Sequence, residues 1–249
     1  MKDAIEQVKA RKWFYPYRLP DGSTVSSYHS NNVQNIHETR WSMLKDCMDR
    51  RLAETGSRGR AIDIGCHQGY FAIGMRQSGF EEVVGIDARE SHIDDSRLMA
   101  EALGLDRLTL ECAHIDNIEP ERLGSFDLVL MFGLLYHLEN PIGALRLCRR
   151  LCRGICVIET QLAPNTSGFI DFGSPEFVRQ LRGSFNIVDE TGEQDGLETG
   201  VSGISLVPSY EALVWSLMKV GFSNVTPLAA PKDGWDQLVH HKRVMVVAS

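Results

Sequence analysis

A glycine-containing turn at residues 63–69 is the first candidate for a functional site. Residues 61–64 are short, apolar and β-branched, with one acid among them, a pattern typical of a buried parallel strand. The sequence then reads Asp63-x-Gly65-x-His67-x-Gly69 and continues into a predicted helix. A strand, a glycine turn and a helix in this order form the first crossover of a doubly wound sheet, where ligands lie beyond the carboxyl ends of the strands. The turn therefore predicts a cofactor site.

The spacing of the glycines constrains the cofactor. A dinucleotide site requires G-x-G-x-x-G, whose second glycine lets the backbone approach a diphosphate. His67 stands at that second position, and its side chain would occupy the space that the phosphates need. The pattern disfavours a dinucleotide and favours a cofactor without phosphates, with an ordinary tight turn as the alternative.

An acid at the end of the next predicted strand, residues 82–87, indicates a nucleoside. Asp87 follows Gly65 by 22 positions. A carboxylate at the tip of the second strand can accept hydrogen bonds from both ribose hydroxyls. The alternative is an N-cap for a helix beginning near Ser91. Because the glycine turn lies one strand earlier, we favour the ribose role.

Alternating strands and helices must position these residues. Further strands are expected at 108–112, 126–131 (at the centre of the sheet) and 155–160, with helices between them, which predicts an α/β fold with a doubly wound, Rossmann-like sheet. The expected organisation is an N-terminal arm and cap helix at 1–59, a cofactor-binding core at 60–162, a substrate-side insertion at 163–207, and a C-terminal helix and strand hairpin at 208–249.

Two segments outside the core are expected to lie near the ligands. The aromatic cluster 13–17 predicts either a lid over the cofactor or substrate, or an arm that covers the edge of the sheet. The insertion, rich in Pro, Gly, Ser and Asn, is of the kind that shapes a substrate pocket at the carboxyl edge of a sheet.

The composition is that of an ordinary soluble protein. Hydrophobic residues make up 43% and charged residues 24% of the 249 positions, and no apolar run is long enough to span a membrane. The start lacks the apolar stretch of a signal peptide, and the six cysteines lack disulfide-framework spacing, which predicts a cytoplasmic protein with reduced thiols. The net charge of −7 argues against a broad surface for polyanions.

Three of the cysteines, Cys148, Cys152 and Cys156, are close enough in sequence to be considered as metal ligands. Their spacing places two on one helix face and the third in a strand beyond a glycine, which favours core packing instead. We therefore expect no metal ion in the protein.

The motifs resemble those of a known family. The pattern at 63–69 resembles motif I of the class I S-adenosylmethionine (SAM) methyltransferases, D/E-x-G-x-G-x-G, with its middle glycine replaced. Residues 132–141, together with 207–222, are similar to the subfamily that contains the tRNA wobble-uridine carboxymethyltransferase and many small-molecule relatives. The resemblance covers 60–162 and 208–249 and implies a seven-stranded methyltransferase sheet with SAM as cofactor.

The resemblance also implies which residues contact the cofactor. Asp116, at the tip after strand 108–112, matches the residue that bonds the adenine amino group, while Trp41, Lys45 and Tyr136 match residues that lie against the cofactor. The full expected set is Trp41, Lys45, Asp63, Gly65, Cys66, His67, Gly69, Tyr70, Asp87, Ala88, Asp116, Asn117, Met131, Phe132, Gly133 and Tyr136.

The chemistry of methyl transfer predicts one more residue type. An acceptor hydroxyl or protonated amine needs a base, and imidazole gains and loses a proton near neutral pH. His137, just after the central strand, is our candidate, with a role in orienting the loop as the alternative. Glu159, at the end of strand 155–160, is the second candidate.

The acceptor is expected to be a small molecule, such as a sugar or a secondary metabolite, methylated on oxygen or nitrogen, because the chain is acidic. A tRNA substrate is the first alternative, and basic groups such as Lys242-Arg243 would have to form a local surface for it. A nicotinamide-dependent oxidoreductase and a non-catalytic SAM-binding module are the others. The oligomeric state stays open.

Overall fold

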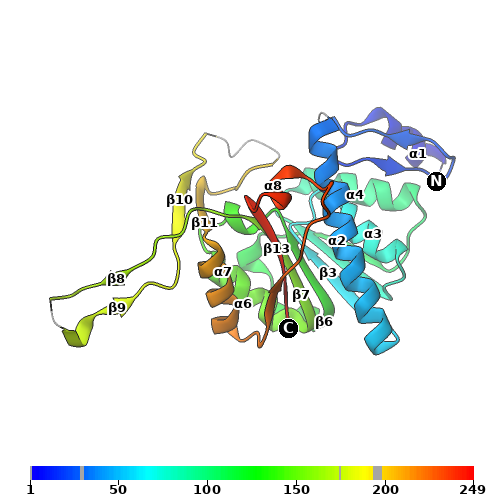
Figure 1. Ribbon diagram of the computed structural model, residues 1–249. Helices are drawn as coiled ribbons and strands as arrows, with labels where there is room; N and C mark the ends of the chain where they lie inside the picture. The colour runs from blue at the N-terminus through cyan, green and yellow to red at the C-terminus, as the bar shows by residue number, and fades with distance from the viewer. Residues whose placement is uncertain (1, 29–30, 174, 193–197) are drawn as a thin grey trace.

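The computed structural model describes residues 2–28, 31–173, 175–192 and 198–249 (Figure 1). Its strands are β1 (Tyr17–Arg18), β2 (Thr24–Val25), β3 (Arg60–Ile64), β4 (Glu82–Asp87), β5 (Leu108–Cys112), β6 (Phe126–Phe132), β7 (Cys152–Gln161), β8 (Phe169–Ile170), β9 (Arg179–Gln180), β10 (Phe185–Asp189), β11 (Ile204–Pro208), β12 (Val225–Pro227) and β13 (Arg243–Ala248). Its helices are α1 (Lys2–Ala10), α2 (Asn31–Thr55), α3 (Tyr70–Gln77), α4 (Glu90–Ala102), α5 (Pro120–Leu123), α6 (Pro141–Leu151), α7 (Tyr210–Val220) and α8 (Asp236–Val239).

The core is a seven-stranded sheet in the order β12-β13-β7-β6-β3-β4-β5. The five strands from β7 to β5 are parallel, and β13 runs antiparallel between β7 and β12. The strand order reverses between β3 and β6, so their carboxyl ends diverge and leave a crevice there. The predicted doubly wound sheet with a C-terminal strand hairpin is confirmed, and β6 is its central strand.

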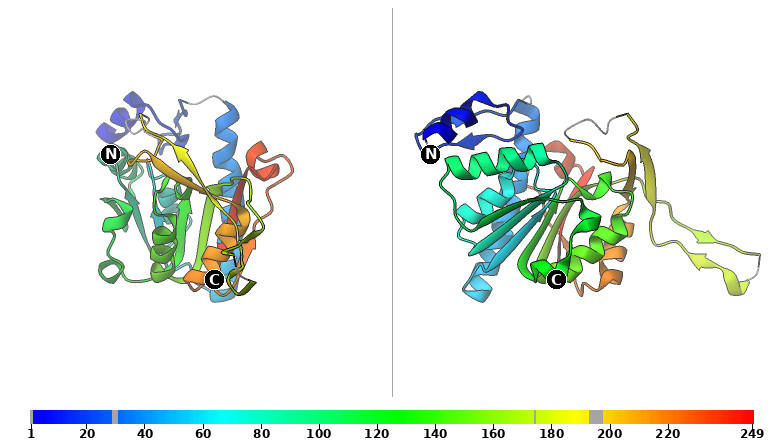
Figure 2. Two further views of the ribbon diagram at one scale, coloured as in Figure 1. Left: turned by 90° about the vertical axis from the view of Figure 1, so that its left-hand side faces the viewer. Right: turned by 180° about the vertical axis from the view of Figure 1, so that it is seen from behind.

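Helices cover both faces of the sheet (Figures 1 and 2). α2, α3 and α4 pack on one face, and α6 and α7 pack on the other. Because successive side chains of a strand point to opposite faces, Ala61 and Val83 belong to the first apolar cluster and Ile62 and Val84 to the second. Burial of strands on both faces accounts for their continuous apolar sequences.

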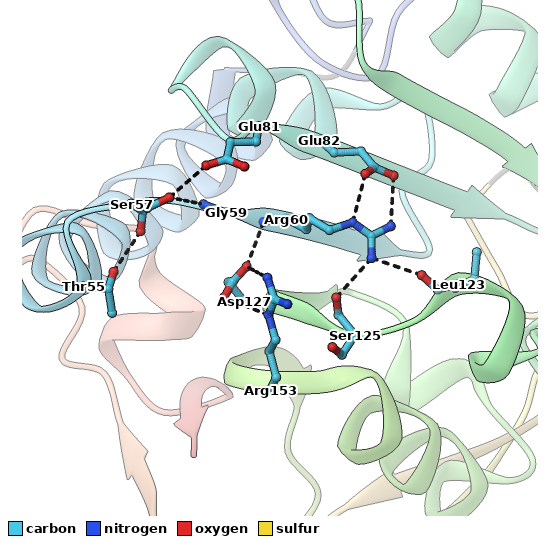
Figure 3. A network of polar contacts seen from close by, with 10 residues as sticks. All are labelled: Thr55, Ser57, Gly59, Arg60, Glu81, Glu82, Leu123, Ser125, Asp127 and Arg153. Carbon is cyan, nitrogen blue, oxygen red and sulfur yellow. Dashed lines mark hydrogen bonds and ion pairs between the residues drawn. The ribbon is translucent and has the colours of Figure 1, made fainter.

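Polar contacts join the strands at their amino ends, opposite the crevice (Figure 3). Arg60 of β3 pairs at two points with Glu82 of β4, each at 2.9 Å. Asp127 of β6 accepts a hydrogen bond from the Arg60 backbone N–H at 2.9 Å and pairs with Arg153 of β7 at 2.6 Å. Burial alone would raise the pKa of Asp127, but these two partners lower it. The network stabilises the relative positions of four parallel strands.

Two segments extend beyond the sheet. At the N-terminus, α1 and the β1–β2 hairpin lie against α4 and the start of α3, where the Tyr17 hydroxyl donates to the Gln68 carbonyl at 2.7 Å. Within the described part of 163–207, β10 pairs with β11 and β8 pairs with β9, and the β8–β9 hairpin projects away from the body (Figures 1 and 2).

The three cysteines considered as metal ligands, Cys148, Cys152 and Cys156, are buried in the cluster between the sheet, α6 and α7. Among the described residues, no group of His, Cys, Asp or Glu side chains is arranged to hold a metal ion. In the same part of the chain we find no helix whose length and apolar character would let it span a bilayer.

Candidate active site

A cavity of about 430 Å³ opens at the carboxyl ends of β3, β4, β5 and β6. Its volume falls in the range of about 300–1,000 Å³ that small-molecule sites occupy. The N-terminal segment, α2, the insertion and β13 complete its walls. The predicted site residues that line it are Gly65, His67, Asp87, Ala88, Asp116, Phe132, Gly133, Tyr136 and His137.

The glycine turn forms the floor of the cavity between β3 and α3. Gly65 has a φ of 77°, a left-handed conformation that suits glycine, and its N–H donates to the Ile86 carbonyl at 2.8 Å. His67 also has a positive φ, 51°. The residue at the middle position of the motif therefore keeps the left-handed backbone that glycine readily adopts, while its ring adds bulk to the cavity wall.

Asp87 sits at the centre of a set of donors at the tip of β4. One carboxylate oxygen accepts from the His67 backbone N–H at 2.8 Å. The other lies 3.0 Å from the Arg89 backbone nitrogen and 3.1 Å from Nδ1 of His92. Burial would raise the pKa of Asp87, but His92, Arg89 and His67 together lower it. Asp87 is thus an oriented carboxylate at the cavity wall.

Two histidine rings stack beside this carboxylate. The centroids of His67 and His92 are 3.7 Å apart. Burial, and then the neighbouring His92, lowers the pKa of His67 to about 3, so this ring is neutral at physiological pH. The Nε2 atoms of both rings are buried and have no hydrogen-bond partner within the described residues. His92 contacts the Asp87 carboxylate from the side of α4, and the His67 ring stacks on His92.

The wall beyond β5 is suited to a flat heterocycle. Ala113, Ile115 and Ile118 give it an apolar surface, and Asp116 adds a carboxylate at its exposed rim. Together with Asp87, these residues fit the nucleoside of SAM, whose ribose offers two hydroxyls and whose adenine offers an amino group.

A histidine–carboxylate pair lies at the other end of the cavity. His137 ends the short 3₁₀ turn Leu135–His137 that follows β6. Its Nδ1 atom is 2.8 Å from Oε1 of Glu190, which directly follows β10. The other Glu190 oxygen accepts from the Gly200 N–H at 3.0 Å. Burial would raise the pKa of Glu190, but Gly200 and His137 outweigh burial and lower it. An ionised Glu190 therefore orients the His137 ring.

Glu159 lies behind the cavity wall between two arginines. It is fully buried, with Arg40 of α2 at 2.6 Å and Arg243 of β13 at 3.2 Å. The Gly133 N–H also donates to Glu159, at 3.0 Å. Arg243 further donates to the Tyr136 hydroxyl at 2.9 Å. This arrangement fits a carboxylate that positions Arg40 and Arg243 at the cavity.

Asp63, the acid of the glycine motif, is buried below the cavity rather than in its wall. Burial, and then the nearby Asp87, raises the pKa of Asp63 to about 7. Its Oδ2 atom has no hydrogen-bond partner within the described residues. The structure thus gives the two motif acids different states: Asp87 is ionised and Asp63 is partly protonated near neutral pH.

The remaining predicted residues lie outside the cavity lining. Trp41 packs on α3, where a Cβ on Gly74 would approach its ring to 2.6 Å. Lys45 is one turn further along α2 and pairs with Asp49 at 2.6 Å in solvent. Tyr70 stacks on Tyr15, which does line the cavity. The others outside the lining are Cys66, Gly69, Asn117 and Met131.

The structure also adds residues that the sequence analysis missed. Arg40, His92 and Arg243 line the cavity, and Glu190 supports His137 from behind. Arg243 had a weak signal as part of the basic pair 242–243, and Glu190 lies in the insertion that we expected near the substrate. Phe14 and Tyr15, from the aromatic cluster, reach the cavity as a lid would require. The sequences around Arg40 and His92 contain no motif that would predict a place for either residue in the site.

Fold and site together define the class: a SAM-dependent methyltransferase. A methyltransferase domain family matches residues 34–226, and the chain belongs to it. The resemblance found in the sequence is therefore confirmed, and the nicotinamide alternative is not supported.

Individual relatives divide between two kinds of acceptor. The chain is similar to the tRNA U34 carboxymethyltransferase of Desulfotalea psychrophila, with 26% identity over 191 residues, which are 76% of this chain and 51% of the relative. It is also similar to the ubiquinone biosynthesis O-methyltransferase of Neisseria meningitidis, with 29% identity over 94 residues, 38% of this chain and 40% of the relative. The chain thus spans about half the length, or less, of these curated relatives.

Solved structures share the fold. The N-terminal domain of EvdMO1, crystallised in the presence of SAH and D-fucose, superimposes with a TM-score of 0.69 at 19% identity and covers 99% of this chain and 95% of that one. The glycopeptide N-methyltransferase MtfA gives a TM-score of 0.52 at 16% identity, covering 81% of this chain and 94% of that one.

Proposed function

We propose that this domain transfers a methyl group from SAM to an oxygen, or a nitrogen, of a small-molecule acceptor such as a sugar, with His137 as the general base. The observation that carries the proposal is the 2.8 Å contact between His137 and Glu190 at the cavity wall. Glu190 accepts the Nδ1 proton of the ring, which leaves Nε2 as the basic atom. A base so oriented is of use for a hydroxyl acceptor, which is protonated at neutral pH.

In this proposal the cofactor binds at the end of the cavity near Asp87 and Asp116, and methyl transfer takes place at the other end, near His137. Asp87, Asp116 and the apolar residues beyond β5 bind and orient the nucleoside. Bound SAM supplies an electrophilic methyl group on its sulfonium. Holding the acceptor in line with this group provides much of the acceleration. His137 removes the acceptor proton, and the Glu190 carboxylate stabilises the resulting positive ring.

A small acceptor is supported by the acidic net charge of −7 and by a fold neighbour crystallised with D-fucose. The second candidate is a tRNA wobble-uridine-type (carboxy)methyltransferase, which the sequence relatives favour. The third is a non-catalytic SAM-binding module, which would bind the cofactor without any turnover.

A methyl-transfer assay with radiolabelled SAM distinguishes these candidates. We expect label to enter D-fucose or related deoxysugars, or other hydroxylated small molecules of a metabolite panel, and not tRNA at physiological salt. Label in tRNA with a steep loss at higher salt would replace the proposal by the tRNA alternative. SAM binding without label in any acceptor would favour the non-catalytic module.

A further inference from the structure

Exposed apolar side chains gather on one side of the molecule. Among the described residues, every large apolar side chain that is exposed, except Tyr28, lies between residues 169 and 204 or on α7. A monomeric surface normally scatters such residues, whereas a concentrated patch marks an interaction site. The patch lies away from the walls of the cavity, apart from Val201.

The first part of the patch is the projecting hairpin. We call residues 163–173 and 175–184 the arm; it contains β8 and β9 and stands off the body (Figures 1 and 2). Its phenylalanines Phe169, Phe172 and Phe177 are 67%, 68% and 53% exposed. Only two residue pairs join β8 to β9. An isolated two-stranded hairpin is marginally stable in water, so an arm of this kind needs a surface to pack on.

The second part of the patch is a complementary surface at the base of the arm. α7 packs on the sheet through Ala212, Leu213 and Leu217. Its opposite side exposes Trp215 and Met218, where a helix on the outside of a domain normally presents polar residues. The adjoining β10–β11 ribbon exposes apolar residues on both of its faces: Ile187 and Ile204 on one, and Val188 on the other.

We propose that a second copy of this chain covers the patch, with the arm of each copy packed on α7 and the β10–β11 ribbon of the other. A projecting segment and an apolar surface on the same side of one chain are the two halves of a self-complementary interface, which a two-fold axis brings together twice. The arm and its acceptor surface are both apolar, so contact between them removes both from water.

The charges of the two surfaces permit this pairing. The arm carries two acids and two bases, among them Asp171 and Arg182. On α7, Glu211 and Lys219 lie on either side of Trp215, and the Lys219 ammonium is 5.6 Å from the centre of the Trp215 ring. The arm and α7 each have no net charge, and the β10–β11 ribbon adds the single acid Asp189, so electrostatic repulsion between two copies is small.

The area available also suits a dimer. The three arm phenylalanines and Trp215, each about half exposed or more, together with their aliphatic neighbours, would bury on the order of 1,200 Å² in two copies. This reaches the lower range of about 1,200–2,000 Å² for stable protein interfaces.

Sedimentation velocity over a concentration series tests the proposal. We expect the wild type to sediment as a dimer, and Phe172→Asp and Trp215→Asp each to raise the dimer dissociation constant at least tenfold. Gln7→Asp adds the same carboxylate on exposed α1, outside the patch, and serves as the matched control that stays dimeric. Circular dichroism confirms that each variant is folded. A wild type that is monomeric at every concentration would overturn the proposal.

Cross-linking then tests the exchange of arms. In a Cys112→Ser background, which removes the one cysteine that is not buried, Phe172→Cys and Trp215→Cys are placed on separate chains of different tag length. After mixing, a bismaleimide should join the two chains in a mixed product. A dimer that yields no mixed product, or a Phe172→Cys/Trp215→Cys double variant that links only within one chain, would contradict exchange between copies.

Discussion

At the scale of single residues, the cavity assigns different states to side chains of the same type. Asp87 is held ionised by three donors, whereas Asp63 is buried nearby without a partner for one oxygen. His67 is neutral, and His137 is oriented by an ionised carboxylate. Differences of environment, rather than of residue type, thus set the protonation states of these side chains.

His137→Ala should lower kcat by about 10²–10⁴-fold with SAM affinity within a few-fold of wild type, because the ring acts on the acceptor and not on the nucleoside. His240→Ala, at an exposed histidine outside the cavity, is the control. Single-turnover methyl transfer and calorimetric SAM binding measure the two quantities. Unchanged turnover would remove His137 from the chemistry.

Glu190→Gln tests the positioning role of Glu190. Without the negative charge, the protonated His137 ring is less stable, so we expect a lower kcat and an acid limb of the pH–rate profile that moves to lower pH. Asp189→Asn, the adjacent exposed acid, should leave the profile in place. A merely structural role for Glu190 would change stability without moving the acid limb.

Asp63→Asn should change how stability depends on pH. Between its ordinary pKa of 3.8 and about 7, folded Asp63 retains a proton that the unfolded chain has released. This group therefore makes the free energy of unfolding fall as the pH rises through that window, by about 2–4 kcal/mol. The variant lacks this contribution, so relative to wild type it should gain stability between pH 4 and pH 8 in urea titrations. A constant difference between the two proteins would contradict the assignment.

Sequence reasoning reached those residues that lie within one motif or at the end of a predicted strand. Gly65, His67 and Asp87 were accessible because strand ends in a parallel sheet meet at one edge. Glu190 and Arg40 could not be predicted in this way. Each contacts a partner more than fifty positions away in the sequence, which only the folded structure brings close. Lys45, which we expected against the cofactor, is exposed on α2 and pairs with Asp49.

At the scale of elements, the end of the central strand is held by a buried charge network. Arg40 from α2 and Arg243 from β13 both pair with Glu159 of β7, so three elements converge behind Tyr136 and Gly133. Two guanidinium groups share one carboxylate, so the loss of Glu159 would leave both buried arginines without an ion-pair partner. The network links the cap helix and the last strand to the end of the cavity near His137.

Glu159→Gln should destabilise the protein by about 3–5 kcal/mol, because it leaves two buried cations without an anion. Arg243→Met should cost less, because Arg40 and Glu159 then remain a matched pair. Urea denaturation of both variants, followed by circular dichroism, gives the comparison. If Arg243→Met were the more damaging change, the network would owe its stability to the Arg243–Tyr136 contact instead.

The order and type of the core elements followed from the alternation of buried strands with helices, and β5 lies where it was expected, at 108–112. β7 begins earlier than predicted, at Cys152, because the strand continues through Arg153 and Gly154 beside β6. The hairpins of the insertion were not predicted, because their exposed, irregular sequences lack the period that marks a core strand.

At the scale of the whole molecule, binding and association occupy separate regions. The cavity lies at the carboxyl edge of the sheet, and the apolar patch lies along the insertion and α7. The insertion belongs to both, because β10 runs from the arm to Glu190. Contacts between two copies would therefore stabilise the segment that supports His137.

Phe172→Asp should weaken the dimer but keep the SAM affinity within about twofold of that of the wild type. Asp87 and the glycine turn, which we expect to bind SAM, lie outside the patch. Calorimetric titration at a concentration where this variant is monomeric measures it. A large loss of SAM affinity would show that the cofactor end of the site depends on the second copy.

We propose that Asp87 binds the ribose of SAM. Isothermal titration of SAM into wild type, Asp87→Ala and Asp87→Asn tests it most directly, with Asp94→Ala as the matched control because that carboxylate is exposed on α4. Loss of two charge-assisted hydrogen bonds should weaken binding about 100-fold in both Asp87 variants and leave Asp94→Ala unchanged. SAM bound to Asp87→Ala as tightly as to wild type would rule out this role of Asp87.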